Sequence, residues 1–324
     1  MSSYVFSIGL IVAGLVIGQL LRRGAARGRI RHPERLGRSL RRTQQFALLG
    51  LSPIVTLGAF WGVSVRDARF MSLPFLGVGA LVLGGLLGLA ASRLLRHDRA
   101  RTGAMFCSSC FTNLGSFGGL VSFLFFGEAG YVIVSLYRLF EEIAYFTVGF
   151  PVAKRYGAGS GEGPAGNPVL RILKDPYIMV YLVCILSGIL LKLSGIGRPA
   201  FISSMNAVLV PVVSLILVIT TGFNMRLGAI KGYLRECAAV GLVKFVVTPA
   251  VITALALLTG LGEADGGFAL RVVFVLAAMP PAFYSLIPPQ IYKLDGDLAN
   301  SCWLFNSGVF LLLLPGLYYV QGLL

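Results

Sequence analysis

The chain has 324 residues, of which 56% are hydrophobic and only 13% are charged, and its mean hydropathy is +0.82. A typical soluble domain carries about 25% charged residues, so the composition excludes an ordinary soluble protein and indicates lipid as the solvent. Histidine occurs only at His32 and His97, which excludes a multi-histidine metal or haem site, and we expect no metal or cofactor. The formal net charge of +15 would suggest nucleic acid in a soluble protein. Here the basic residues fall in short loops between apolar runs, so no nucleic-acid partner is expected.

Ten apolar stretches approach the length of about 20 residues that a helix needs to cross a bilayer. The predicted spans are 4–21, 44–63, 71–92, 103–126, 130–152, 176–194, 205–225, 236–259, 268–290 and 301–321. The first span lacks a basic start and a small-residue cleavage site, so we expect it to be retained as a helix. The fold class predicted is therefore an all-α integral membrane protein with ten transmembrane helices.

Lysine and arginine are unevenly divided between the loops on the two sides. The loops after the odd-numbered spans hold 21 basic residues, and those after the even-numbered spans hold 4. By the positive-inside rule the first set is cytoplasmic, which predicts a multi-pass protein of the cytoplasmic membrane with both termini extracytoplasmic. The glycine-rich loop 154–175 is interpreted as a flexible cytoplasmic linker. It separates two five-helix halves, 1–153 and 176–324, and because five is odd the second half must be inverted, as in inverted-repeat transporters.

Such transporters bind substrate near the bilayer midplane, where corresponding helices of the two halves are broken. The ninth span carries a double proline near its middle, which is expected to break the helix. The fourth span has an asparagine followed by glycines. These glycines either unwind the helix or let it pack closely against a neighbour. We expect the fourth and ninth spans to cross. The tenth span adds an asparagine that either lines the same cavity or makes an interhelical hydrogen bond. The predicted substrate-binding residues are Asn113, Gly115, Gly118, Gly119, Met279, Pro280, Pro281 and Asn306. Cys107 and Cys110 form a CxxC in the fourth span and are interpreted as helix-packing residues.

Two acidic residues, Glu141 and Glu142, lie in the middle of the fifth span. A charge at the bilayer centre costs roughly 2.5–3.5 kcal/mol on insertion scales, so both are candidates for ion coupling. Arg138 precedes them by three and four positions and is able to pair with either one. The other glutamate would then be free to carry a proton, and Glu142 is slightly preferred for that role. Lys244 of the eighth span either reaches the headgroups, pairs with a glutamate, or faces an anionic substrate.

These residues together resemble the auxin efflux carrier family, which includes plant PIN auxin exporters and bacterial malonate and malate permeases. The resemblance covers nearly the whole chain. It is carried by Asn113 with the glycines after it, by the FGEAG loop at 126–130, by Lys244 ahead of Pro249, by the Ala-Met-Pro run at 278–280, and by Lys-Asp-Pro at 174–176. It implies an inverted-repeat fold with crossed broken helices, transport of organic anions, and a homodimer.

Three functions compete at this point. The leading hypothesis is a secondary active transporter of small organic anions such as carboxylates and auxin-like acids, working by alternating access, because half-helix N-termini present positive dipole ends to an anion. A proton is the expected coupling ion in preference to sodium. The alternative is a cation–proton antiporter or a sodium-coupled organic anion symporter that uses Glu141 and Glu142. An intramembrane enzyme would need acidic metal motifs or a Ser–His pair, and the sequence supplies neither, so no enzymatic activity is expected.

Overall fold

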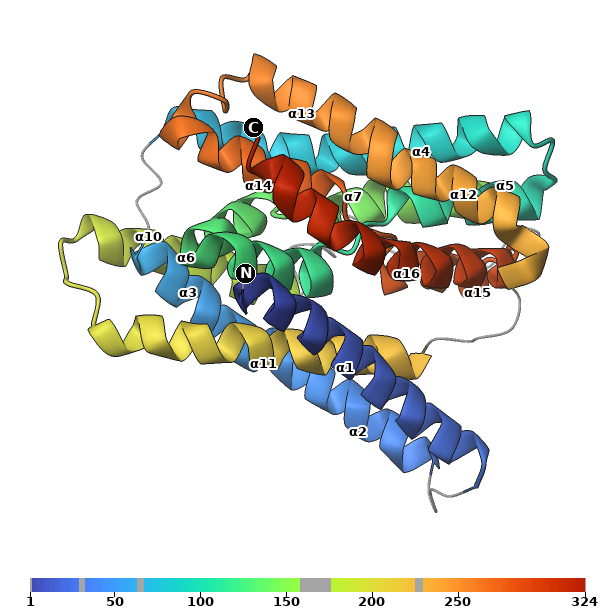
Figure 1. Ribbon diagram of the computed structural model, residues 1–324, viewed down its shortest axis with the longest axis horizontal. Helices are drawn as coiled ribbons and strands as arrows, with labels where there is room; N and C mark the ends of the chain where they lie inside the picture. The colour runs from blue at the N-terminus through green and yellow to red at the C-terminus, as the bar shows by residue number, and fades with distance from the viewer. Residues whose placement is uncertain (1, 29–32, 63–66, 158–175, 225–229, 324) are drawn as a thin grey trace. The chain divides into compact units, whose positions relative to one another are not determined.

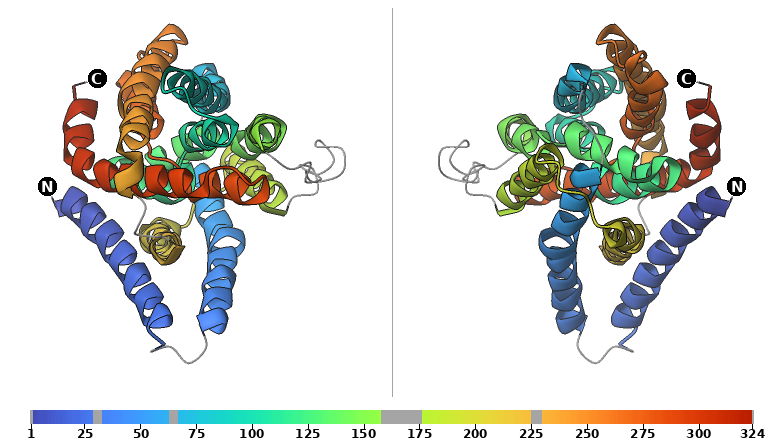
Figure 2. Two further views of the ribbon diagram at one scale, coloured as in Figure 1. Left: turned by 90° about the vertical axis from the view of Figure 1, so that its right-hand side faces the viewer. Right: turned by 90° about the vertical axis from the view of Figure 1, so that its left-hand side faces the viewer.

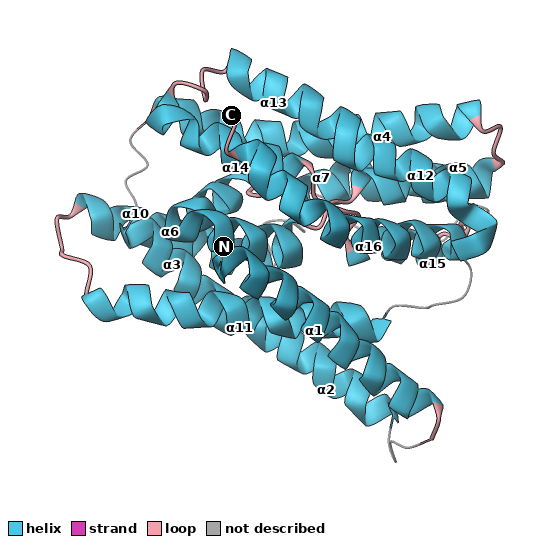
Figure 3. Cartoon of the chain, in the orientation of Figure 1, coloured by secondary structure: helices cyan, strands magenta, loops and turns pink. Residues whose placement is uncertain are grey.

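The structure is a computed structural model that describes residues 2–28, 33–62, 67–157, 176–224 and 230–323. These residues are almost entirely helical, and among them no β-strand is formed (Figure 3). Seven helical stretches are long and apolar enough to cross a membrane: Gly9–Ala26, Pro33–Gly62, Ala68–Leu94, Leu114–Tyr156, Ala200–Asn224, Ile230–Leu258 and Gly296–Gln321. The fold is therefore all-α, with the helix lengths and composition of a multi-pass membrane protein.

Interrupted helices account for two of the three spans by which the predicted ten exceed the seven stretches found. The third is the predicted sixth span, where only the shorter apolar helix Leu182–Leu193 is found within the described residues. The 43-residue stretch Leu114–Tyr156 contains the predicted fifth span and part of the fourth, and Gly127, with φ 67°, interrupts its helix between them. The predicted ninth span is divided into the short helices α14 (Phe268–Ala277) and α15 (Ile287–Ile291). The count of ten therefore remains a prediction, as does the inverted repeat.

The helices form two compact units, each assembled from both halves of the sequence. Unit 1 comprises Met1–Arg66, Gly115–Val132 and Leu173–Met225, and unit 2 comprises the rest. The two sequence halves are thus not the two compact bodies of the fold. All of the predicted linker beyond its first four residues, that is 158–175, lies outside the described residues.

Unit 1 contains α1 (Ser2–Ala26), α2 (Pro33–Phe46), η1 (Ala47–Leu51), α3 (Ser52–Gly62), α10 (Pro176–Leu193), α11 (Ala200–Asn224) and the first part of α6 (Gly119–Tyr137). Helix α11 lies between α1 and α3 (Figure 1 and Figure 2). Glycines let α1 and α11 approach closely, because a Cβ at Gly18 would come within 2.5 Å of the Phe223 nitrogen. Arg198 holds the FGEAG loop with a two-pronged ion pair to Glu128, at 2.7 and 2.8 Å.

The arginine-rich segment 22–42 was expected to be a loop, and that expectation is wrong for most of it. Helix α1 continues to Ala26, and α2 begins at Pro33, a residue whose fixed φ suits the first position of a helix. Arginine is a good helix former, and none of the α2 side chains is buried. The helical stretch Pro33–Gly62 has 30 residues, or about 45 Å, so part of it must extend beyond a hydrocarbon core about 30 Å thick.

Unit 2 begins with η2 (Ala68–Ser72), α4 (Leu73–Leu94), α5 (Arg99–Cys110), α7 (Glu141–Ala144), η4 (Tyr145–Gly149) and α8 (Phe150–Tyr156). It continues with η5 (Ile230–Tyr233), α12 (Leu234–Leu242), η6 (Val243–Val247), α13 (Thr248–Leu258), η7 (Ala264–Gly267), α14, η8 (Phe283–Leu286), α15 and α16 (Gly296–Gln321). Small residues pack α4 onto α5. A Cβ at Gly84 would overlap the carbonyl oxygen of Ser109, and one at Gly88 would lie 2.7 Å from the Ser109 side chain.

Three π-helical turns, η1, η4 and η6, each precede a proline at the second position of the next helix: Pro53, Pro151 and Pro249. A proline ring clashes with the carbonyl four residues earlier and offers no N–H, so a wider turn before it relieves the conflict. The stretch that contains the predicted fifth span is therefore not a single α-helix, because it includes η4 and also a turn at 138–140 that separates Tyr137 from α7.

Candidate functional site

Two interrupted helices of unit 2 meet where their backbones become extended. Helix α5 ends at Cys110, α14 ends at Ala277, and Thr112 forms an antiparallel bridge with Pro281. The bridge is closed by the Asn113 N–H, which donates to the Pro280 oxygen at 2.9 Å, and by the Ala282 N–H, which donates to the Phe111 oxygen at 3.0 Å. We call residues 111–113 and 278–282 the bridge region. Its hydrogen bonds satisfy backbone groups that the broken helices leave without partners.

The sequence predicts the position of the non-helical backbone more accurately at 278–282 than at 111–113. Met279, Pro280 and Pro281 lie in the non-helical segment, as the double proline predicts. On the other side the extended backbone is at 111–113, while 114–118 forms the π-helical turn η3 (Leu114–Gly118). Irregular backbone was expected around Gly115–Gly119 and instead begins four residues earlier. By packing, Asn113 belongs to unit 2 with the prolines, whereas Gly115, Gly118 and Gly119 belong to unit 1.

A chain of polar contacts runs through the bridge region from Lys244 to Arg138. Lys244, on η6, is only 1% exposed, and its Nζ donates to Thr112 Oγ1 at 2.6 Å. The Thr112 N–H donates to the hydroxyl of Tyr145 at 3.2 Å, and that hydroxyl lies 2.8 Å from Glu141 Oε1. Glu141 is completed by Arg138, whose Nε donates to Oε2 at 2.9 Å. The contacts link the buried Lys244 on η6 to the ion pair between Glu141, at the start of α7, and Arg138, in the turn before it.

The Tyr145 hydroxyl has more possible hydrogen-bond acceptors than it has hydrogens to donate. Its hydroxyl has one hydrogen and two possible acceptors, Glu141 Oε1 at 2.8 Å and the Thr112 carbonyl oxygen at 3.1 Å. It therefore donates to one of them at a time, and the charged carboxylate is the stronger acceptor. The Tyr145 hydroxyl therefore lies within hydrogen-bonding distance of both the Glu141 carboxylate and the backbone of the bridge region.

The structure shows the contacts of three residues for which the sequence left alternatives open. Lys244 is buried against Thr112 and does not reach towards the headgroups. Arg138 pairs with Glu141, three positions on, while the neighbouring Glu142 is less deeply buried. Asn306 is fully buried, and its Nδ2 donates to the Cys237 carbonyl oxygen of α12 at 3.1 Å, an interhelical hydrogen bond, and to the Cys302 carbonyl oxygen of its own helix at 2.9 Å.

Several buried polar atoms near the bridge region make no hydrogen bond within the described parts of the chain. Ser285, three residues beyond the bridge region, is fully buried, and its Oγ has no partner. The Nε1 of Trp303 has none either, and the Trp303 ring packs edge-on against Phe283 at 5.7 Å. Buried donors are nearly always satisfied in proteins, so each of these calls for an explanation, and a bound ligand is one.

Sequence reasoning did not identify Tyr145, Ser285 or Trp303. The signal for Tyr145 was its position four residues after Glu141, which places both on one helical face. All five cysteines are free, and four of them, including Cys107 and Cys110, are buried, as expected of packing residues. Among the residues that the structure describes, no group of three or more His, Cys, Asp or Glu is placed to hold a metal ion.

No protein-family model matches the chain, and no curated protein matches it. The resemblance to auxin efflux carriers therefore rests on the short motifs alone.

Proposed function

We propose that this protein is a secondary active transporter of small organic anions, with ten transmembrane helices in two inverted five-helix repeats and both termini extracytoplasmic. The observation that carries the proposal is Lys244. A lysine ammonium has three hydrogens to donate, and at Lys244 only Thr112 accepts one within the described residues. A buried ammonium with two unused donors, beside a break in two helices, is suited to a carboxylate ligand.

The bridge region supplies the rest of the proposed substrate site. Ser285 and Trp303 offer donors that lack partners, and Trp303 with Phe283 offers an aromatic surface for the apolar part of a substrate. Non-helical backbone inside a membrane is tolerated where it lines a cavity or is buried in protein, and substrate sites of inverted-repeat transporters use the first of these. Small carboxylates and auxin-like acids fit this combination of one cation, neutral donors and aromatic rings.

The proposed coupling ion is the proton, carried by Glu142. Glu142 is the less deeply buried of the two glutamates, so it is the more accessible to protons from water. The pairing of Glu141 with Arg138 and Tyr145 weighs against the alternative of a cation–proton antiporter or sodium-coupled symporter, because the Glu141 carboxylate is not available to a metal cation. Protonation of Glu142 would reduce its repulsion of an anionic substrate, so transport should be faster at lower pH.

Flux in proteoliposomes tests the function and the coupling. Purified protein is reconstituted and uptake of labelled malate, malonate, an auxin-like acid and sodium is measured. Saturable uptake of one of the acids is expected, and uptake of sodium alone would support the alternative. Glu142→Gln should flatten the pH profile, whereas Glu141→Gln, the matched control, should mainly lower stability. If both variants keep the wild-type profile, the proton-coupling proposal is wrong.

Single cysteines test the orientation. In a background with Cys184 replaced, because the other four native cysteines are buried, one cysteine is placed at Arg155 and another at Ser194, both exposed positions. The charge asymmetry puts Arg155 on the cytoplasmic side and Ser194 outside. An impermeant maleimide should therefore label position 194 in intact cells and position 155 only after permeabilisation. The reverse pattern would overturn the proposed topology.

A further inference from the structure

A cavity of about 390 Å³ opens at the end of unit 2 where α4 turns into α5. Its charged and polar lining consists of Arg96, His97, Asp98, Arg101, Arg235 and Glu236. The basic loop 93–101 predicts that this end is cytoplasmic. Helix α5, 12 residues or about 18 Å long, separates the cavity from the bridge region, so the cavity is distinct from the proposed substrate site.

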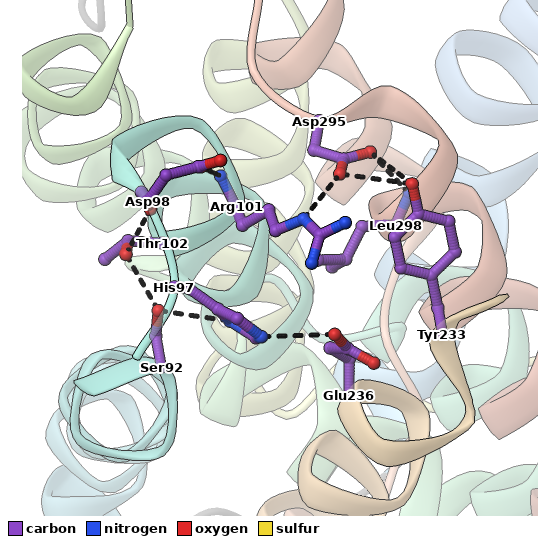
Figure 4. A network of polar contacts seen from close by, with 9 residues as sticks. All are labelled: Ser92, His97, Asp98, Arg101, Thr102, Tyr233, Glu236, Asp295 and Leu298. Atoms are coloured by element: carbon purple, nitrogen blue, oxygen red, sulfur yellow. Dashed lines mark hydrogen bonds and ion pairs between the residues drawn. The ribbon is translucent and has the colours of Figure 1, made fainter. Parts of the chain in front are cut away.

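The first wall of the cavity is a buried pair of side chains (Figure 4). His97 Nε2 lies 3.1 Å from Glu236 Oε1, and these side chains are 6% and 10% exposed. Behind the ring, Ser92 Oγ lies 3.4 Å from His97 Nδ1 and donates to Thr102 Oγ1 at 2.8 Å. These contacts tie the end of α4, the start of α5 and the first turn of α12 together.

The second wall is formed around Arg101 (Figure 4). Its Nε lies 3.5 Å from Asp295 Oδ2, and its guanidinium lies 5.7 Å from the centre of the Tyr233 ring. The Tyr233 hydroxyl in turn donates to Asp295 at 3.2 Å. The shape of the cavity is therefore fixed by contacts among four separate segments of unit 2, and is not left to a single loop.

The charged lining of the cavity consists of three arginines and two carboxylates, beside His97. Asp98 Oδ1 accepts the Arg101 N–H at 2.8 Å as the cap of α5, and Glu236 is engaged by His97. By contrast, the side chains of Arg96 and Arg235 are exposed and make no ion pair or hydrogen bond with the described chain. Two guanidinium groups without such a partner thus line the same cavity. Guanidinium forks bind phosphate oxygens in pairs.

The backbone at Arg96 is strained in a way that points to a role for its side chain. Arg96 has φ 55°, in the left-handed region, and its N–H donates to the Arg93 oxygen while the His97 N–H donates to the Ser92 oxygen. This is the Schellman ending of a helix, in which the left-handed position is usually glycine. An arginine at that position is strained, and strained non-glycine residues gather at ligand sites.

We propose that this cavity binds a phosphate group, with Arg96 and Arg235 as its principal ligands and Arg101 at its side. The phosphate belongs either to a soluble phosphate compound or to the headgroup of an anionic phospholipid, since basic pockets between helices on the cytoplasmic side bind such headgroups. Exposed leucines next to both arginines, Leu94 at 84% and Leu234 at 51%, are suited to the boundary between headgroups and acyl chains. The proposal does not depend on the proposed transport function.

Binding of two probes by the delipidated full-length protein tests the proposal. The first probe is inorganic phosphate, titrated against chloride at constant ionic strength, and the second is phosphatidylglycerol in nanodiscs, compared with phosphatidylcholine. The wild type should bind at least one probe saturably. Saturation by inorganic phosphate identifies a soluble ligand, and selectivity for phosphatidylglycerol alone identifies a headgroup. If the wild type binds neither probe, the proposal is wrong.

Variants locate the binding in the cavity. Arg96→Gln with Arg235→Gln should weaken binding at least tenfold. The matched control is Arg93→Gln with Lys231→Gln, which removes the same charge from exposed positions close by and should change affinity less than twofold. Equal losses of affinity in the two double variants would show that the probe is attracted by the general positive charge of this surface, and the proposed site would be wrong. Arg96→Gly separates binding from folding, because it should weaken binding while raising the unfolding temperature, and a purely structural arginine would not produce opposite changes.

Discussion

Replacing Arg138 should destabilise the protein mainly because it leaves the buried Glu141 carboxylate without its cation. The Arg138 Nε lies 2.9 Å from Glu141 Oε2, and the Glu141 side chain is 5% exposed. At an effective dielectric constant of about 20, two unit charges at that distance attract with roughly 6 kcal/mol. Burial of both groups offsets part of this, less so for Arg138, which is 24% exposed. We expect Arg138→Gln to lower the free energy of unfolding by about 3 kcal/mol, because Tyr145 alone then supports a buried carboxylate.

A double-mutant cycle tests this reasoning. Glu141→Gln leaves an arginine able to reach solvent and should cost about 1–2 kcal/mol, and the double variant should cost less than the sum of the two single variants. Reversible denaturant unfolding in mixed micelles, followed by tryptophan fluorescence, gives the four free energies. A coupling energy of about 2 kcal/mol is expected. If the free-energy losses of the two single variants sum to that of the double variant within about 0.5 kcal/mol, Arg138 and Glu141 do not stabilise each other. That result would contradict the account of the polar chain.

Two further predictions concern packing and backbone conformation. Gly84→Ala should destabilise unit 2 by about 1–3 kcal/mol, because its Cβ would overlap the Ser109 carbonyl oxygen. The control Gly79→Ala, on the same helix, meets only Ile252 at 3.8 Å and should be neutral or slightly stabilising. Equal unfolding midpoints for the two variants would contradict the α4–α5 packing. Arg96→Gly should stabilise the protein by about 1 kcal/mol, because glycine adopts a positive φ without steric cost, and a lower unfolding midpoint would contradict the strain at this position.

The parts of the fold that depend on local sequence were predicted well. The all-α membrane character follows from composition and from the apolar runs. The break at Pro280 and Pro281 follows from proline's missing N–H. Helical spacing predicted that Arg138 pairs with one of the two glutamates, and the structure shows that Glu141 is a partner. The π-helical turn Tyr145–Gly149, which lies two to six residues ahead of Pro151, was not predicted, because such a turn leaves no mark in hydropathy.

The parts that depend on distant contacts were not predicted. Lys244 and Thr112 are 132 residues apart, and the sequence left three roles open for Lys244 until their contact was known. The contact between His97 and Glu236, which are 139 residues apart, was not predicted, because each is an isolated polar residue next to a basic loop. The extended backbone at 111–113 is set by hydrogen bonds to Pro280 and Ala282, so local glycine content predicted the wrong position for it.

The central claim is that Lys244 binds the anionic group of a transported substrate, and counterflow tests it most directly. Proteoliposomes are loaded with an unlabelled acid from the panel, and uptake of trace labelled acid from outside is measured for the wild type, Lys244→Met and Lys192→Met. Lys192 is the control because its side chain is exposed and donates to the Gly62 carbonyl oxygen. The account predicts accelerated uptake for the wild type and for Lys192→Met, and at least a tenfold loss for a correctly folded Lys244→Met. Counterflow by Lys244→Met at the wild-type rate would contradict it.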